Sequence, residues 1–318
     1  MMLSQKIAAF FRLIRYPNLI FIALTQSLFY FIIEKRIFSE INNSFLPELC
    51  TNDFLLLLFS SILIAAGGYI INDYFDMDID NVNKPHKLVI GKIISRRWAM
   101  LFHMLLSLIG LFLTAVVALH INNMLLLVFN FISVVLLLFY STTFKKRLLI
   151  GNIIISLLTA WVVGVLFVAE LKIDDVALII KNNNLIERLY KFTLIYAGFA
   201  FIVSLVREVI KDLEDIIGDK KYGCTTMPIV WGVNVSKIYA ATWIVVLMGI
   251  LLSLFFYTII NSWSWLFSLM IIILLVFLIV ILVNIKKAAT SKDFGKISNQ
   301  VKLLMLMGIL SMALFIDL

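Results

Sequence analysis

Long apolar runs divide this chain and set the strongest limit on its fold. About 20 apolar helical residues are needed to cross the hydrocarbon core of a membrane. The chain has 63% hydrophobic and 14% charged residues, which is too little polar surface for a water-soluble protein of 318 residues. We therefore predict an all-α membrane protein, one domain over residues 1–318, with nine transmembrane helices in one bundle. The predicted spans are residues 17–37, 54–72, 99–119, 124–141, 149–169, 192–210, 237–258, 264–284 and 301–317.

Lysine and arginine residues alternate between the two sides of these predicted spans. The N-terminus and the loops after the second, fourth, sixth and eighth spans hold 21 of the 27 Lys and Arg residues, among them Lys302 after the eighth. Such a bias is typical of cytoplasmic loops. It predicts a multi-pass protein of the cell (inner) membrane with a cytoplasmic N-terminus. It also explains the net charge of +8 without a nucleic-acid partner.

Two clusters of aspartates follow the second and sixth spans and form a pseudo-repeat, at residues 72–80 and 212–219. Each cluster has carboxylates at positions i, i+3 and i+7, which share one face of a helix. The members are Asp73, Asp76 and Asp80 in the first cluster, and Asp212, Asp215 and Asp219 in the second. The predicted orientation puts both clusters on the cytoplasmic side of the membrane.

Three like charges on one helix face next to a membrane are unfavourable unless a cation balances them. Mg²⁺ prefers oxygen ligands, and it usually takes one or two carboxylates and leaves its other positions to water and phosphate. Two opposed acid faces therefore predict a clamp for a magnesium-bound diphosphate, with lysines and arginines of the same loops contacting the anion. Two solvated helix ends are the alternative, which the repeated spacing on one side disfavours.

At these residues the sequence resembles the UbiA family of intramembrane prenyltransferases. The two aspartate clusters match the family's two acid motifs, the first beginning at Asn72. Tyr140 before Lys145 and Lys146, and Gly151-Asn152, are further shared features. The segment 207–228 is most similar to the digeranylgeranylglyceryl phosphate synthase branch. Residues 83–91 depart from the Arg-Pro-rich stretch of many members, so no role is assigned to His86.

The resemblance implies Mg²⁺-dependent transfer of a prenyl group, best geranylgeranyl, from an allylic diphosphate to a lipophilic acceptor, best geranylgeranylglyceryl phosphate. It implies that the metal ligands are Asp76, Asp80, Asp215 and Asp219. It further implies that Asn72 orients the first carboxylates or ligates the metal directly, that Asp73 and Asp212 complete the acid faces, and that Tyr140 lines the path of an allylic cation. The candidate substrate contacts are Lys84, Lys87, Lys145, Lys146, Arg207 and Lys211, whose alternative role is to set the membrane orientation.

Two other functions stay open at this point. The same machinery serves prenylation of an aromatic acceptor in quinone biosynthesis, of the 4-hydroxybenzoate or dihydroxynaphthoate type. A transporter of an ion or a phosphometabolite is more remote, because the acids follow the spans instead of lying at mid-membrane. We also expect Gly67 and Gly68 to permit close helix contact, and His103 to be an internal hydrogen-bonding group.

Overall fold

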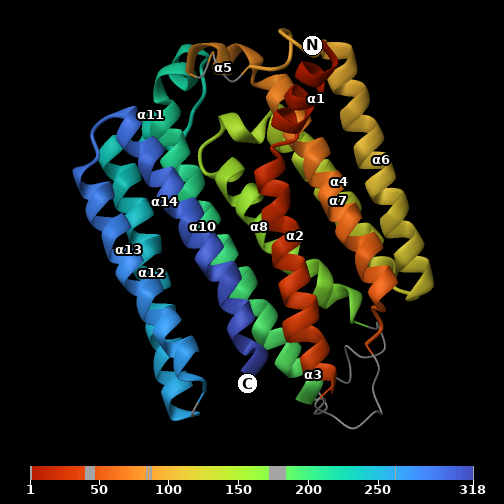
Figure 1. Cartoon of the computed structure of the whole chain (residues 1–318). Helices are drawn as coiled ribbons and strands as arrows, with labels where there is room; N and C mark the ends of the chain where they lie inside the picture. Colours follow the sequence, from red (N-terminus) through yellow and green to blue (C-terminus); the bar gives the residue numbers. More distant parts are fainter. Residues whose placement is uncertain are drawn as a thin grey trace.

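The computed structural model describes residues 2–39, 47–83, 85, 88–171, 184–261 and 263–317, and its elements there are helices. Figure 1 shows them as a bundle, with α5 and α11 at one end and α3 at the other. The elements are α1 (Met2–Leu13), α2 (Tyr16–Leu28), η1 (Phe29–Glu34), α3 (Lys35–Ser39), α4 (Thr51–Phe75), α5 (Met77–Asn83), α6 (Arg96–His120), α7 (Met124–Thr142), η3 (Phe144–Lys146), α8 (Ile150–Ala169), α10 (Asn184–Lys221), α11 (Met227–Val230), α12 (Val233–Ile260), α13 (Trp265–Lys287), α14 (Ser291–Leu310) and η5 (Ser311–Asp317).

Nine helical segments of the described chain are long and apolar enough to cross a membrane, which confirms the predicted number of spans. Many of their outward side chains are large and apolar, such as Phe112, which is 66% exposed, and Ile260, which is 79% exposed. Such side chains suit a lipid environment, since acyl chains are as apolar as they are. The side of the membrane on which each end lies stays a prediction.

The two largest errors in the predicted helix boundaries concern the functional end of the bundle. The sixth span does not end at residue 210, because α10 continues without a break through the second aspartate cluster. The ninth does not begin at residue 301, because α14 begins at Ser291, where Thr290 and Asp293 form a capping box. Charged residues in the first turns of α14 made this stretch look like a loop. As a result, Lys302 lies within α14 and not before it.

Small residues let α4 and α6 pack closely, as expected for Gly67. A Cβ atom on Gly67 would lie 2.7 Å from Ser107 Oγ, so no larger residue fits without a shift. The Gly67 carbonyl oxygen also lies 3.0 Å from His103 Nδ1, and His103 is 8% exposed. The expected role of His103 as an internal hydrogen-bonding group is therefore confirmed. This packing fixes the end of α4 that carries the first aspartate cluster.

Candidate active site

One large cavity of about 950 Å³ opens among α2, α4, α7, α8, α10 and α14. Residues of both aspartate clusters line it at one end, and mostly apolar side chains such as Ile64, Leu158 and Ile309 line it further along. The fold therefore brings together acids that are more than 130 positions apart in the chain. Among the sequence-predicted site residues, the cavity is lined by Asn72, Asp73, Asp76, Asp80, Tyr140, Lys145, Arg207, Lys211, Asp212, Asp215 and Asp219.

The first cluster lies where α4 ends and α5 begins. Asp76 occupies the junction, yet its N–H still donates to the Asn72 carbonyl at 3.0 Å and its own carbonyl accepts from Asp80 N–H at 2.8 Å. The helical spacing predicted for this cluster is thus nearly kept through the junction. Asp76 is 2% exposed, so its carboxylate lies inside the protein.

Cations from distant segments balance the first cluster. Arg15, before α2, donates to Asp73 at 2.5 Å, and Lys145, in η3, pairs with Asp76. The Asp73 carboxylate raises the pKa of Arg15 above its ordinary value. Burial alone would lower the pKa of Lys145, but Asp76 and Tyr140 outweigh it and raise that pKa. Burial, reinforced by the Asp76 charge, raises the pKa of Asp80 to about 6, so an added cation is favoured at this position.

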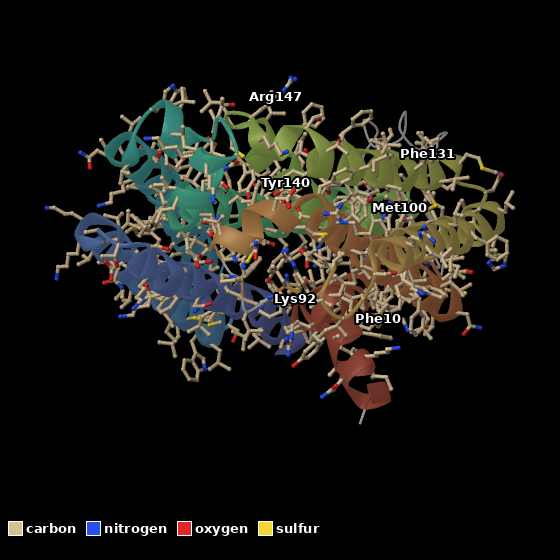
Figure 2. All side chains as sticks on the ribbon, turned by 90° about the horizontal axis from the view of Figure 1, so that it is seen from above. Phe10, Lys92, Met100, Phe131, Tyr140 and Arg147 are labelled. Atoms are coloured by element: carbon tan, nitrogen blue, oxygen red, sulfur yellow. The ribbon has the colours of Figure 1, made fainter. Side chains whose placement is uncertain are left out.

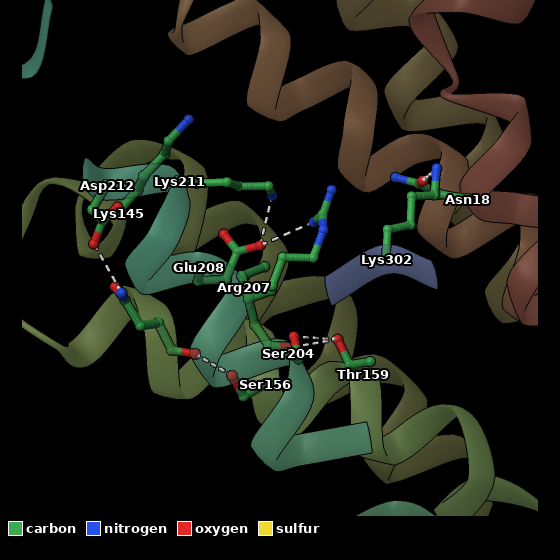
Figure 3. Close-up of polar contacts among 12 residues, drawn as sticks. Asn18, Lys145, Ser156, Thr159, Ser204, Arg207, Glu208, Lys211, Asp212 and Lys302 are labelled. Carbon is green, nitrogen blue, oxygen red and sulfur yellow. Dashed lines mark hydrogen bonds and ion pairs between the residues drawn. The ribbon is translucent and has the colours of Figure 1, made fainter. Parts of the chain in front are cut away.

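The second cluster lies on the unbroken α10 and has different partners. Asp212 accepts a hydrogen bond of 2.8 Å from Asn152 Nδ2 of α8. One turn earlier, Glu208 accepts from Lys211 at 2.6 Å and pairs with Arg207 at 3.5 Å. Figure 3 shows Glu208 between Lys211 and Arg207, with a dashed line to each of them. Arg207 and Lys211 are therefore both paired with Glu208.

Asn83, three residues after the first cluster, forms hydrogen bonds with the backbone of the second cluster. Its Nδ2 donates to the Asp215 carbonyl at 3.1 Å, and its Oδ1 accepts from Gly218 N–H at 2.8 Å. These bonds join the end of α5 to α10 between Asp215 and Asp219. Sequence reasoning missed Asn83 and Arg15, because nothing in their local sequence indicates contacts with segments so far away.

Tyr140 lies inside the bundle near the end of α7, whereas Arg147 lies at its edge (Figure 2). Tyr140 is 8% exposed, and the chain after it turns back through η3 to place Lys145 in the cavity. Gly151 makes this possible, because a Cβ atom there would lie 2.8 Å from the Phe144 carbonyl oxygen. The neighbouring Lys146 is exposed and is not among the cavity-lining residues. Lys84 and Lys87 lie outside the described residues.

The donor set of the cavity fits magnesium held jointly with a diphosphate. In the described part of the chain, no three acidic, histidine or cysteine residues lie close enough to hold a metal ion by themselves. Mg²⁺ needs only one or two carboxylates when phosphate and water supply its other ligands. Asn72 also lines the cavity, and its buried Oδ1 has no hydrogen-bond partner among the described residues, so it is one further candidate oxygen ligand. Carboxylates on two facing elements suit such a shared ion.

Comparisons with known proteins agree with this arrangement. The sequence model of the UbiA prenyltransferase family matches residues 44–306. The digeranylgeranylglyceryl phosphate synthase of Methanosphaera stadtmanae is 30% identical over 254 residues, which cover 80% of this chain and 84% of that protein. The enzyme of that name from Methanothermobacter thermautotrophicus is 31% identical over 202 residues, 61% of this chain and 62% of its own length.

Solved structures agree as well. One described as a digeranylgeranylglyceryl phosphate synthase in membranes is 26% identical, with a TM-score of 0.67 over 99% of this chain and all of that one. A UbiA homologue from Archaeoglobus fulgidus bound to DMAPP and Mg²⁺ is 16% identical, with a TM-score of 0.57 over 96% of this chain and 99% of that one, and supports the fold alone. Because the family match spans most of the chain, this protein belongs to the UbiA prenyltransferase family and is a membrane prenyltransferase.

Proposed function

We propose that this enzyme transfers a geranylgeranyl group from its diphosphate to geranylgeranylglyceryl phosphate, with Mg²⁺ as cofactor. The observation that carries the proposal is that both aspartate clusters line the same cavity. Lys145 pairs there with Asp76 of the first cluster, and mostly apolar side chains line the rest of the cavity. The polar end suits a metal-bound diphosphate, and the apolar walls suit prenyl chains. The relatives named above, which carry the name of this reaction's enzyme, support this acceptor.

The site residues follow from this geometry. Asp76, Asp80, Asp215 and Asp219 would hold Mg²⁺, which neutralises the charge that develops on the leaving diphosphate. Asn72 would orient the first carboxylates or ligate the metal directly, and Asp73 and Asp212 would complete the two acid faces. Lys145, which pairs with Asp76 and lines the cavity, would contact a diphosphate oxygen. Lys211 is held nearby by Glu208 and serves the same anion.

The reaction itself breaks the bond between the allylic carbon and the diphosphate oxygen, and the diphosphate leaves with the electron pair. The acceptor hydroxyl oxygen then bonds to that carbon, and its proton passes to the released diphosphate. Tyr140 presents a buried aromatic ring beside Lys145, and an aromatic face stabilises a passing carbocation without reacting with it. Trp161 also lines the cavity, where its Nε1 donates to Asn130 Oδ1 at 2.8 Å, so its ring orientation is fixed.

The acceptor is tested by incubating purified protein with Mg²⁺, radiolabelled geranylgeranyl diphosphate and a panel of acceptors. We expect product with geranylgeranylglyceryl phosphate, and none with 4-hydroxybenzoate or a dihydroxynaphthoate. The opposite result would assign the enzyme to quinone biosynthesis. Omission of Mg²⁺ should abolish the product in either case, because the acid faces then repel the diphosphate.

We propose further that residues 1–318 act as one domain and that both clusters face the cytoplasm. Cysteine labelling from each side of the membrane tests this orientation. Single cysteines in place of the exposed Asn81 and Lys220, in a Cys50→Ser, Cys224→Ser background, should react from the cytoplasmic side. The native Cys50 is exposed where α4 begins, at the other end of the helix from the first cluster, and should react from the opposite side. Labelling of Asn81→Cys and Lys220→Cys from different sides would exclude a shared site.

A further inference from the structure

Lys302 is a cation inside a membrane span that borders the cavity. The span covers Ser291–Phe315, and the side chain is one of the cavity-lining groups. Its Nζ donates to Asn18 Oδ1 of α2 at 3.0 Å and lies 5.2 Å from the centre of the Phe21 ring. Figure 3 shows Lys302 reaching toward Asn18, beside the group formed by Arg207, Glu208 and Lys211. An ionisable residue at this depth is costly and usually serves a function.

Carboxylate pairing distinguishes Lys302 from the other cavity cations with described contacts. Arg15 has Asp73 and Lys145 has Asp76, whereas Arg207 and Lys211 share Glu208. In the described part of the chain, Lys302 contacts a neutral amide and an aromatic ring. The charged group near enough to interact with it electrostatically is another cation, Arg207.

Arg207 also has a hydrogen-bond donor that is not used within the described part of the chain. Its Nε is buried and has no hydrogen-bond partner among the described residues. Arg207, Lys211 and Lys302 thus bring three positive charges to one part of the cavity, where Glu208 pairs with Arg207 and Lys211 but has no described contact with Lys302. This part of the cavity is therefore suited to an anion.

Lys302 and Arg207 lie deeper in the bundle than the second aspartate cluster. Ser291 Oγ of α14 donates to the Glu214 carbonyl of α10 at 2.8 Å, which sets the level of the two helices next to the second cluster. At about 1.5 Å per residue, the Lys302 backbone is about 16 Å further into the bundle, and Arg207 is about 10 Å below Glu214. Because helical side chains point toward the N-terminus of their helix, Lys302 reaches back toward the level of Arg207.

The separation of these two cations from the second aspartate cluster suits the chemistry of the proposed acceptor. In geranylgeranylglyceryl phosphate, the phosphate and the reacting hydroxyl are on neighbouring glycerol carbons. A molecule whose hydroxyl meets the allylic carbon next to the diphosphate must therefore place its own phosphate a short distance from the diphosphate. That second dianion cannot share the first one's ligands, since like charges repel at close range.

We propose that Lys302 and Arg207 form a phosphate-binding subsite for the acceptor, separate from the diphosphate site between the aspartate clusters. The inference rests on the proposed function, because it requires a phosphorylated acceptor. Arg207 offers a planar pair of donors and Lys302 a point charge, and the two together suit a phosphate monoester. Asn18 holds the Lys302 ammonium in position before the acceptor enters. Sequence reasoning placed Lys302 in a loop and so gave it no such role.

The experiment compares Lys302→Met with the matched control Lys296→Met, which removes an exposed lysine of α14 that is not among the cavity-lining residues. A charge-assisted hydrogen bond contributes enough that its loss should raise the KM for geranylgeranylglyceryl phosphate about ten- to a hundredfold. The KM for geranylgeranyl diphosphate should stay within about twofold of the wild-type value. Lys302→Arg keeps the charge and should restore most of the acceptor affinity.

A second acceptor completes a thermodynamic cycle. Geranylgeranylglycerol, which lacks the phosphate, should be a poor substrate of the wild-type enzyme, and Lys302→Met should cause no further loss with it. Equal losses with both acceptors would mean that Lys302 supports the structure only, and would overturn the subsite. If Lys302→Met does not fold, as judged by size-exclusion chromatography, Lys302→Gln is measured in its place.

Three further results would overturn the inference in distinguishable ways. Turnover of geranylgeranylglyceryl phosphate with an unchanged acceptor KM in Lys302→Met would remove the subsite and leave the proposed function intact. Turnover of aromatic acceptors alone would remove the proposed function and the subsite with it. Thermal stabilisation by phosphatidylglycerol that equals that by the acceptor, and that is lost in Lys302→Met, would assign the cations to a lipid headgroup instead.

Discussion

The two aspartate clusters have the same spacing but different electrostatic surroundings. The first lies at the junction of α4 and α5, and its Asp73 and Asp76 are paired with Arg15 and Lys145. The second lies on the continuous α10, where Asp212 is bonded to the neutral Asn152 and Glu208 takes the nearby cations instead. Identical patterns in sequence therefore correspond to different described partners, since Asp73 and Asp76 form direct ion pairs and Asp212 is bonded to a neutral amide.

This difference indicates a division of roles. Metal binding at the first cluster would compete with the ion pair between Lys145 and Asp76, which would leave the lysine available to the diphosphate. At Asp212 of the second cluster the described hydrogen-bond partner is the neutral Asn152, so we expect no lysine to be displaced from that side chain. The proposed metal site would need carboxylates from both clusters. The following predictions test this requirement.

Loss of one carboxylate from either cluster should have the largest effect. Asp76→Asn and Asp215→Asn each remove a charged oxygen ligand with little change in shape, so kcat should fall about a thousandfold. Asp78→Asn and Glu187→Gln are matched controls on α5 and α10, since both side chains are exposed and are not among the cavity-lining residues. Near-normal turnover in only one of the two ligand variants would mean that a single cluster suffices.

Lys145→Met should have the next largest effect. It removes a partly exposed cation that pairs with the buried Asp76, and kcat/KM for the prenyl diphosphate should fall about a hundredfold. Lys146→Met is the matched control, because that neighbouring side chain is exposed and is not among the cavity-lining residues. Equal losses in the two variants would favour membrane orientation as the role of both lysines.

Asn83→Ala tests the link between the two clusters. It removes both hydrogen bonds from α5 to α10 and should raise the Mg²⁺ concentration needed for half-maximal activity about tenfold. The overall structure should persist, because the helices also pack through their spans. Asn81→Ala, on an exposed side chain of α5, is the control. An unchanged magnesium requirement would show that the clusters are aligned by other contacts.

Arg15→Gln should have the smallest effect of the four. The ion pair with Asp73 is partly exposed, with the Arg15 side chain 35% accessible, and such pairs contribute about 1 kcal/mol or less. We expect kcat/KM to fall at most about fivefold. Arg147→Gln, which changes an exposed arginine at the edge of the bundle, serves as the control. A loss as large as that of Lys145→Met would mean that Arg15 contacts substrate directly.

The sequence was informative where the signal is local. Apolar runs predicted nine spans, and the i, i+3, i+7 spacing predicted which aspartates line a common cavity. It was uninformative where partners come from far away, since the Arg15–Asp73 pair joins residues 58 positions apart and the Asn83–Asp215 bond joins residues 132 apart. It misled at α14, because the first turns of that helix carry charges on one side and resemble a loop.

Magnesium-dependent binding of an unreactive donor analogue tests the shared site most directly. The measurement is the thermal stabilisation of the purified protein by geranylgeranyl thiolodiphosphate, with and without Mg²⁺, since a ligand that binds the folded state raises its apparent stability. We predict stabilisation of the wild-type protein only when both are present, and its loss in Asp76→Asn and in Asp215→Asn alike. Stabilisation that needs no Mg²⁺, or that survives in either variant, would contradict a metal–diphosphate site built from both clusters.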